Sequence, residues 1–201
     1  MLKVENIEVI GVVGAMRGMR YPKDSEKDSD STSSGIGPKD LELLLKLTRA
    51  GRDHRKVLRC IHVQASINFP MSWLIQYDTY KVSTTAVSRS RMHRLAWRLL
   101  TRDDFFVEEW TPQLQAVLEV LNADISLFQE SGKRDMIAWR RVVDLLPMSY
   151  CQERFIDINY ETLLNILGSR YSEKLKTEWK FFCDKMLEGC PHLREIWEIT
   201  K

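Results

Sequence analysis

The chain has 201 residues, of which 44% are hydrophobic and 29% are charged, a composition typical of one globular domain over residues 1–201. Its 30 lysines and arginines nearly balance its 28 aspartates and glutamates, so we expect no nucleic-acid partner. No apolar run approaches the roughly 18 residues of a spanning helix, and Glu5 and Glu8 interrupt the stretch where an export signal would lie, so we expect a cytoplasmic protein without a membrane partner.

The first half of the sequence predicts two strands, two helices and one long loop. The loop is rich in glycine, serine, proline and charged residues, and a loop of this length is usually functional or disordered. Pro38 and Gly51 mark the start and the end of the first helix, and Pro70 closes the second strand. In chain order the predicted elements are a strand over residues 2–13, a loop over about 14–38, a helix over 38–51, a strand over 56–69 and a helix over 71–80.

The second half is mainly helical, with one strand before its last two helices. Thr111 before Pro112 is a strong helix start, Pro147 ends a later helix, and Gly189 and Pro191 end the last one. The predicted elements are a basic helix over residues 89–102, helices over 111–131 and 133–147, a strand over 149–159, and helices over 158–170 and 172–189. A few strands with many packed helices indicate an α+β domain.

The cysteines and histidines show no pattern typical of a metal site. No two cysteines form a Cys-x-x-Cys pair, and the histidines are scattered. Without an export signal, we expect reduced, structural cysteines rather than disulfides, nucleophiles or metal ligands. The residues concerned are Cys60, Cys151, Cys183, Cys190, His54, His62, His93 and His192.

Residues 158–170, INYETLLNILGSR, combine an apolar stripe with polar ends. The residues on one face of this helix, at about 100° per residue, are Asn159, Leu163, Ile166, Leu167 and Arg170. Burying an unpaired charge is costly, so either the guanidinium reaches water past the leucines or an anion binds to it. The pattern alone leaves both interpretations open.

Residues 145–170, LLPMSYCQERFIDINYETLLNILGSR, resemble the C-terminal motif of the flavin-dependent thymidylate synthases of the ThyX type. In that family a Leu-Pro pair closes one helix, a strand follows, and an asparagine opens a helix that ends in a catalytic arginine. Asn159 stands at the family's distance from the Leu-Pro pair, and Asn165 and Arg170 follow at the family's spacing.

The upstream residues 51–81, GRDHRKVLRCIHVQASINFPMSWLIQYDTYK, are similar to the same family. There a histidine-containing turn leads into a strand and then into a helix with a glutamine, and His54 and Gln76 match these positions. The two stretches extend the resemblance over roughly residues 51–190. It implies a ThyX-like α+β fold with a small mixed sheet and several packed helices.

The resemblance implies an enzyme that reductively methylates dUMP or a related pyrimidine nucleotide with FAD. In the family the reduced flavin carries the one-carbon unit and the hydride, while the protein binds, orients and stabilises charge. For an active enzyme it further implies NADPH, methylenetetrahydrofolate and a homotetramer with its sites at subunit interfaces. The implied roles are charge stabilisation on the pyrimidine by Arg170, cofactor binding by His54, Asn159 and Asn165, and substrate binding by Gln76, Lys81 and Arg91.

The sequence also departs from the family pattern. The Arg-His-Arg signature is Thr79-Tyr80-Lys81 in this chain, and of a later Ser-x-Arg only Arg91 is kept. The other departures are Ala86-Val87 for an Asn-Glu pair, Val143 for an arginine that grips the substrate phosphate, and Glu161 for an arginine that contacts the flavin. These losses leave a second hypothesis open, a non-catalytic oligomeric relative that acts as a nucleotide-binding or assembly module.

Each implied site residue also has a purely structural interpretation. Arg170 suits a helix C-terminus through the helix dipole, and Asn159 is a favoured N-cap. The other structural interpretations are a helix cross-link for Asn165, a turn residue for His54, and solvated charges for Lys81 and Arg91. The sequence therefore names candidates without deciding their roles.

The predicted basic helix over residues 89–102 carries arginines at spacings of three and four. Such a face can bind nucleic-acid phosphates, but no aromatic stacking pattern or nucleic-acid motif accompanies it. We therefore expect a face that meets solvent, another subunit or a ligand. Its members are Arg91, Arg94, Arg98 and Arg102.

Overall fold

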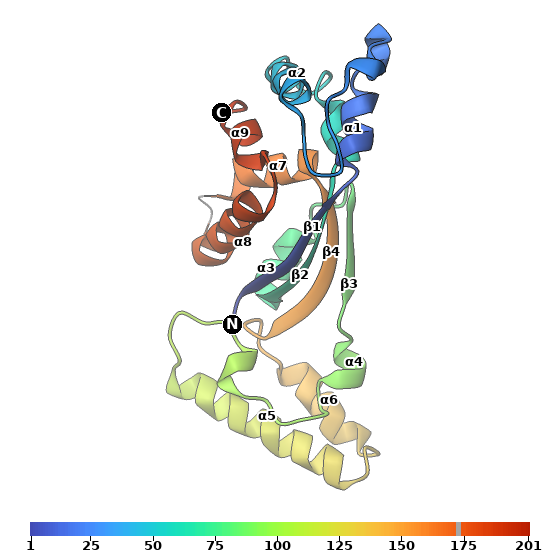
Figure 1. The fold of residues 1–201 in the computed structure, drawn as a ribbon. Helices are drawn as coiled ribbons and strands as arrows, with labels where there is room; N and C mark the ends of the chain where they lie inside the picture. The colour runs from blue at the N-terminus through green and yellow to red at the C-terminus, as the bar shows by residue number, and fades with distance from the viewer. Residues whose placement is uncertain (172–173) are drawn as a thin grey trace. The chain divides into compact units, whose positions relative to one another are not determined.

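The computed structural model describes residues 1–171 and 174–201. Its strands are β1 (Lys3–Ile10), β2 (His62–Pro70), β3 (Thr84–Ser88) and β4 (Cys151–Asn159). Its α-helices are α1 (Val12–Gly18), α2 (Pro38–Arg49), α3 (Met71–Tyr77), α4 (Arg91–Arg94), α5 (Pro112–Glu130), α6 (Met136–Leu145), α7 (Tyr160–Arg170), α8 (Lys176–Gly189) and α9 (Leu193–Glu198). Each strand is followed along the chain by one or more helices (Figure 1), and the predicted α+β class is confirmed.

The strands form one sheet in the order β1-β2-β4-β3, with antiparallel neighbours. The backbone N–H of Met71, just after β2, donates to the carbonyl of Tyr150, just before β4. At the other end the N–H of Tyr160, just after β4, donates to the carbonyl of Ile61, just before β2. The sheet is therefore antiparallel, where the resemblance implied a mixed sheet.

Local signals position β4 and α7 as the sequence predicts. Pro147 follows α6, β4 begins at Cys151, and Asn159 caps α7 by accepting a hydrogen bond from the backbone N–H of Thr162 at 2.9 Å. The apolar side of α7 is buried, as its stripe predicts. The strand and the helix that carry the predicted motif are thus confirmed.

The chain forms two compact units, each assembled from distant segments. Unit 1 comprises Met1–Lys3, Ile67–Thr79 and Val87–Arg154. Unit 2 comprises Val4–Ser66, Tyr80–Ala86 and Phe155–Lys201. Neither unit is a continuous fragment of the sequence, and the single domain over residues 1–201 stays a prediction.

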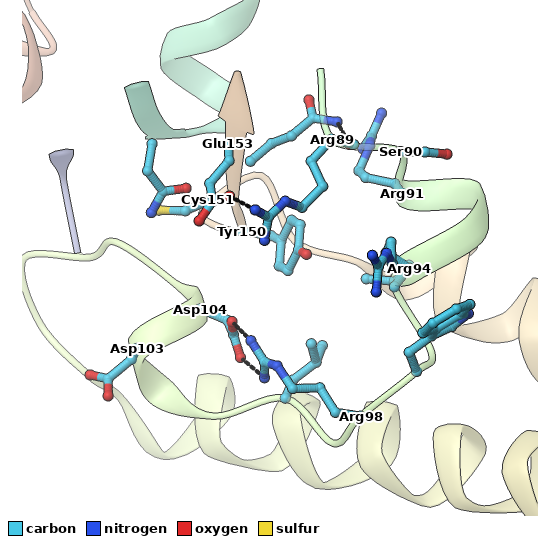
Figure 2. A pocket seen from close by; sticks show the side chains of 15 residues that line it. Arg89, Ser90, Arg91, Arg94, Arg98, Asp103, Asp104, Tyr150, Cys151 and Glu153 are labelled. Atoms are coloured by element: carbon cyan, nitrogen blue, oxygen red, sulfur yellow. Dashed lines mark hydrogen bonds and ion pairs between the residues drawn. The ribbon is translucent and has the colours of Figure 1, made fainter. Parts of the chain in front are cut away.

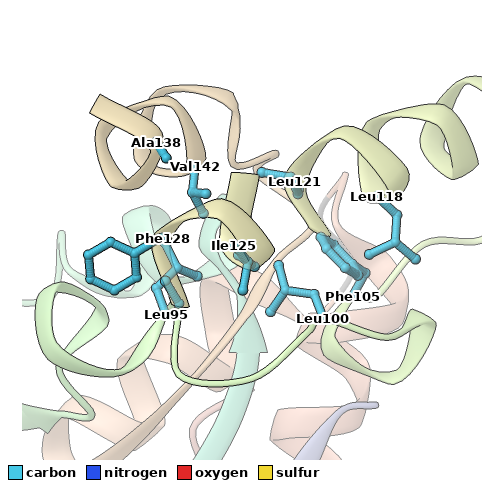
Figure 3. Close-up of a cluster of buried hydrophobic side chains, with 10 residues drawn as sticks. Leu95, Leu100, Phe105, Leu118, Leu121, Ile125, Phe128, Ala138 and Val142 are labelled. Atoms are coloured by element: carbon cyan, nitrogen blue, oxygen red, sulfur yellow. The ribbon is translucent and has the colours of Figure 1, made fainter. Parts of the chain in front are cut away.

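Unit 1 has its own apolar core between α5, α6 and the segment before α5 (Figure 3). Thr111 caps α5 by accepting the N–H of Leu114 at 3.3 Å, and Pro112 occupies the first helical position, so the predicted start is confirmed. Asp135 caps α6 in the same way. The buried members of this core are Leu95, Ala96, Leu100, Phe105, Leu118, Leu121, Ile125, Phe128, Ala138 and Val142.

Unit 2 packs α7, α8 and α9 together (Figure 1). Trp179 and Phe182 of α8 are fully buried, and their rings make an edge contact at 6.1 Å between centroids. The hydroxyl of Tyr160 donates to the carbonyl of Pro191 at 2.9 Å, which ties the start of α7 to the turn before α9. The C-terminal helices therefore hold α7 in a fixed position within unit 2.

Part of residues 14–38, predicted as a long loop, is helical. It contains the end of α1 and two 3-10 turns, η1 (Tyr21–Lys23) and η2 (Glu26–Asp28). The segment folds around Asp40 at the start of α2, whose carboxylate is fully buried and receives the Nε–H of Arg20 at 2.6 Å. A buried carboxylate needs such partners, so this segment is organised by one side chain.

The prediction of one basic helix over residues 89–102 is wrong. Within this range α4 is the only α-helix, and a 3-10 turn, η4 (Arg102–Asp104), begins at the last residue of the range. Between them Leu95 and Ala96 are buried in the unit 1 core, and Arg98 bonds to Asp104. The expected arginine face therefore does not form.

Other boundaries differ less. Residues 56–60, predicted as the start of a strand, form a 3-10 turn that precedes β2. Two elements, β3 and α9, were not predicted, and α8 begins at Lys176. Ser172 and Glu173, where the last predicted helix begins, lie outside the described residues. None of the helices in the described part of the chain has the length and apolar content that crossing a bilayer requires.

Candidate functional site

Unit 1 contains a cavity of about 530 Å³ beside α4. Its wall comes from residues 89–104 on one side and from Tyr150 and the start of β4 on the other (Figure 2). Four arginines face three carboxylates around this cavity, so its lining has an excess of positive charge. The charged residues of the wall are Arg89, Arg91, Arg94, Arg98, Asp103, Asp104 and Glu153.

Packing and local hydrogen bonds fix the backbone that carries these arginines. The side chain of Ser90 caps α4 by accepting the N–H of His93 at 3.3 Å. After α4, Leu100 is tied to α5 by two bonds with Asn122, its N–H donating at 2.7 Å and its carbonyl accepting at 2.9 Å. The arginines therefore project from a segment anchored at both ends.

Two of the four arginines are neutralised inside the cavity wall (Figure 2). Arg98 donates to both carboxylate oxygens of Asp104, at 2.8 and 2.5 Å, and Arg89 pairs with Glu153 at 2.6 Å. Burial alone would raise the pKa of Asp104, but the bonds from Arg98 and from the N–H of Thr101 lower it below its usual value. Asp104 therefore stays ionised, and its pair with Arg98 is structural.

The other two arginines face the cavity without a carboxylate. Within the described residues, neither Arg91 nor Arg94 has an ion-pair partner, and Arg94 lies over the ring of Trp97 at 4.5 Å. Burial raises the pKa of the nearby Tyr150, so its hydroxyl stays protonated and can donate. Two free guanidinium groups and a phenol donor in one cavity form a site suited to an anion.

A second cluster, of one arginine with two aromatic rings, lies in unit 2 around Arg170 at the end of α7. Its Nε–H donates to the hydroxyl of Tyr80 at 2.9 Å, and its guanidinium lies 5.7 Å from the ring centre of Tyr80 and 5.6 Å from that of Trp179. The two rings meet edge to face at 6.3 Å. Arg170 is therefore half-buried and held by aromatic rings, and does not extend freely into solvent.

Comparison with known proteins bears on the fold. No family model and no curated protein matches the sequence. Among solved structures, ThyX from Helicobacter pylori with FAD and dUMP is 18% identical, covers 100% of both chains and gives a TM-score of 0.73. The UMP/dUMP methylase PolB from Streptomyces cacaoi, bound with 5-Br dUMP, is 15% identical, covers 98% of this chain and 95% of its own, and gives 0.66. The chain has the ThyX fold.

The likeness to these solved structures confirms the ThyX-like fold that the sequence resemblance implied. A second Helicobacter pylori ThyX complex, also with FAD and dUMP, gives a TM-score of 0.72 at 18% identity over 98% of this chain and 99% of its own. At such low identity the likeness concerns the fold, so each residue role has to be argued from the geometry of this chain.

The predicted site residues fall into two groups. Gln76 in α3 and Arg91 in α4 belong to unit 1, and only Arg91 lines the cavity. The other five belong to unit 2: His54, Lys81, Asn159, Asn165 and Arg170. Three of these five share α7 and its cap, while His54 and Lys81 are exposed in connecting segments.

Two of the positions that the resemblance assigns to the flavin, Asn159 and Glu161, are engaged in other contacts. Asn159 is 2% exposed, and besides capping α7 its amide donates to the carbonyl of Arg59 at 3.4 Å. Glu161, where the resemblance expects an arginine, accepts two bonds from Arg55 at 2.9 and 3.1 Å. Asn159 therefore acts as an N-cap, which was its structural interpretation. Asn165 is exposed on the surface of α7.

Tyr80, Arg94 and Trp179 were not identified as site residues from the sequence alone. Tyr80 stands at the histidine of the lost Arg-His-Arg signature, so its position was a signal, but its hydroxyl contact was not foreseeable. Arg94 was predicted as one member of a helical face, and Trp179 lay within the last predicted helix without an assigned role. Their roles depend on contacts between distant segments, which a local pattern does not encode.

The cysteines pack in the interior with one exception. Cys151, Cys183 and Cys190 are buried, whereas Cys60 is exposed. Burial raises the pKa of Cys183 and of Cys190 to about 12, so neither forms a thiolate at neutral pH.

Proposed function

We propose that the chain binds a pyrimidine nucleoside monophosphate such as dUMP or UMP, and methylates it as a flavin-dependent enzyme of the ThyX type. The observation that carries the proposal is the cavity of unit 1, where Arg91 and Arg94 have no carboxylate partner among the residues that the structure describes. The fold supports it, because the solved structures compared above are a ThyX with FAD and dUMP and a UMP/dUMP methylase.

The phosphate of the nucleotide is assigned to Arg91 and Arg94. A phosphate oxygen pair accepts bidentate bonds from a guanidinium, and two guanidinium groups match its double charge. The position where the resemblance expects a phosphate-binding arginine is Val143, which packs against the apolar core of unit 1. Arg94 supplies a positive charge that Val143 does not.

The pyrimidine is assigned to Arg170. Its Nε–H donates to Tyr80, and among the described residues the Nη groups have no hydrogen-bond partner, so they are available to a ligand. A fixed cation stabilises negative charge that develops on the ring. The phosphate assignment in unit 1 and the pyrimidine assignment in unit 2 are separate hypotheses, each tested by itself, and neither requires one nucleotide to contact both units of a chain.

FAD is the cofactor that this function requires, with methylenetetrahydrofolate and NADPH as donor and reductant classes. When bound, the flavin would supply the one-carbon transfer and the hydride. The described residues fit it only in part, because Asn159 is consumed as a cap and Glu161 places a carboxylate where a cation was expected. His54 and Asn165 stay candidates for its binding, and we derive no step through the flavin.

A second candidate function is a non-catalytic oligomeric relative. Unit 1 exposes apolar side chains on α5 and α6, such as Val120, Leu127 and Ile137, of which Ile137 is 72% exposed. A second copy of the chain is the partner that this candidate requires, and a homotetramer is its proposed form. The engaged state of Asn159 favours this candidate over full activity.

The first experiment measures nucleotide binding by titration calorimetry. The wild-type protein should bind dUMP, and the double variant Arg91→Ala/Arg94→Ala should bind it about a hundredfold more weakly, since each guanidinium contributes charge-assisted bonds. The matched control is Arg134→Ala/Arg140→Ala, which removes two exposed arginines of unit 1 outside the cavity wall. Equal affinities for both double variants would contradict the phosphate assignment.

The second experiment separates the two candidate functions. The purified protein is incubated with FAD, desalted and scanned for flavin absorbance, and its dUMP methylation is then assayed with NADPH and methylenetetrahydrofolate. Retained flavin with product formation supports the enzyme. A colourless protein that sediments as a tetramer and still binds dUMP supports the non-catalytic relative.

A further inference from the structure

The hydroxyl of Tyr80 belongs to a chain of hydrogen bonds with a fixed direction. Ser169 has one hydroxyl proton, and it donates to the carbonyl of Asn165 at 2.7 Å. The 2.9 Å contact between Tyr80 and Ser169 therefore requires Tyr80 to be the donor. With its proton directed to Ser169, the oxygen of Tyr80 is left as an acceptor, and it receives the Nε–H of Arg170.

This direction fixes the orientation of the guanidinium. The bond at Nε sets one edge of the planar group, and the rings of Tyr80 and Trp179 restrict its tilt from two sides. No bond from the Nη atoms of Arg170 to another described residue accompanies these contacts. The Nη edge therefore presents donors in one plane, the geometry that matches a pair of acceptors on a planar ligand.

We infer that Tyr80 is a positioning residue, which orients Arg170 so that its Nη edge meets the acceptor edge of a pyrimidine base. The inference deepens the proposed function and rests on its assignment of Arg170. Tyr80 occupies the histidine position of the lost signature, so in this chain a phenol performs an orienting role through Arg170. A phenol suits this role, since its oxygen accepts from Arg170 while its O–H donates to Ser169.

Other hydrogen bonds also hold the segment that carries Tyr80, one to α7 and one within the segment. The hydroxyl of Thr162 donates to the carbonyl of Val82 at 3.1 Å, and the hydroxyl of Thr84 bonds the carbonyl of Tyr80 itself. Tyr80→Phe keeps the ring over Arg170 and these backbone attachments, and removes only the hydroxyl. The variant should therefore fold, and its effect reports on the orientation of the guanidinium.

The test combines a local and a functional readout. In ¹⁵N-labelled protein the Nε–H signal of Arg170, assigned by its absence in Arg170→Lys, should be protected from solvent exchange in the wild type and lose that protection in Tyr80→Phe. Affinity for dUMP should fall about tenfold, the value of one hydrogen bond to a charged group. The control is Tyr171→Phe, which removes the neighbouring hydroxyl bonded to Asp184 at 2.8 Å and should leave both readouts unchanged.

A second ligand distinguishes positioning from a structural defect. Deoxyribose 5-phosphate carries the phosphate without the base, so its affinity should be equal in the wild type and in Tyr80→Phe. An equal loss for both ligands, or no loss for dUMP, overturns the inference. Failure of the wild type to bind dUMP would refute the proposed function instead, and unchanged Nε–H protection in Tyr80→Phe would refute the positioning role by itself.

Discussion

Residues 20–40 of unit 2 and the cavity of unit 1 both bring arginine and aspartate side chains together, with opposite results. In the first region Asp40 is buried and accepts bonds from Arg20, from the hydroxyl of Ser29, and from both the N–H and the hydroxyl of Ser31. In the cavity, by contrast, two of four arginines face open space without a carboxylate within the described part of the chain.

The two regions differ in whether the charge is matched by the protein itself. The charge of Asp40 is matched and is structural, whereas two of the arginine charges at the cavity wall are left for a ligand. A buried carboxylate that accepts four hydrogen bonds from its own fold stabilises that fold and is enclosed by its protein partners. Guanidinium groups at a cavity wall contribute little to folding, because water solvates them, but they supply the field that an anion needs. Substitutions in the two regions should therefore change different measurable quantities.

The largest effect on stability is expected for Asp40→Asn. Removing this charge leaves Arg20 buried and unpaired, which should lower the free energy of unfolding by about 3 kcal/mol. Burial alone would raise the pKa of Asp40, but bonds from Ser31, Ser29 and Arg20 lower it below its usual value. Its stabilisation is then present above the usual aspartate pKa and lost as the pH falls through the lowered one.

Urea unfolding of the two proteins at several pH values checks this expectation. The gap in unfolding free energy between wild type and Asp40→Asn should be constant near neutral pH and shrink in acid below about pH 4. Asp28→Asn removes an equal charge from an exposed position in the same segment and should change stability by less than about 0.5 kcal/mol. If Asp40→Asn behaves like Asp28→Asn, the region is not organised by its carboxylate.

Arg170→Lys is expected to have the next largest effect, on binding rather than on stability. Lysine keeps the positive charge but lacks the planar array of N–H donors. If Arg170 acts only through its charge, lysine should substitute for it, but if Arg170 acts as an oriented guanidinium, lysine should not. We expect dUMP to bind about ten- to a hundredfold more weakly. Calorimetry with an unfolding curve on the same sample separates lost binding from lost structure. Undiminished affinity would make Arg170 a simple point charge.

The sequence predicts the elements around Arg170 better than those around the cavity. Strand β4 and helix α7 follow from Pro147, from alternation and from the Asn159 cap, all of which act within a few residues. Residues 89–102 have helical spacing too, but Leu95 prefers the core formed with α5, and the helix stops after one turn. Tertiary packing overrides the local pattern there.

The candidate site shows the same division. The register of α7 placed Arg170 and Asn159 correctly on the helix, and the capping interpretation of Asn159 is the one the geometry shows. The partner of Arg170, Tyr80, is 90 residues away in the sequence, so their contact depends on the fold of unit 2. Strand β3 was missed because its largely exposed residues show no apolar alternation.

Asp104→Asn is expected to have a smaller effect, divided between stability and binding. Asn keeps one acceptor for the N–H of Thr101 but releases Arg98, which should lower the free energy of unfolding by about 1 kcal/mol. The released guanidinium joins the cavity, so phosphate affinity should rise, and should depend more steeply on salt. Unfolding curves and calorimetry at two salt concentrations measure the two effects. A loss of affinity would show that Arg98 acts only while paired.

The smallest effect is expected for Glu153→Gln, which tests whether the cavity selects anions by net charge. Arg89 and Glu153 are both largely exposed, so the pair contributes little to stability, and unfolding should be unchanged within about 0.5 kcal/mol. Losing the carboxylate leaves Arg89 free at the cavity wall, and dUMP affinity should rise about threefold at low salt and return toward wild type as screening increases. The control Asp144→Gln removes the partner of Arg140 outside the wall and should leave affinity unchanged. If both variants leave affinity unchanged, charge in the wall does not govern binding, and the phosphate assignment then depends on the geometry of Arg91 and Arg94 alone.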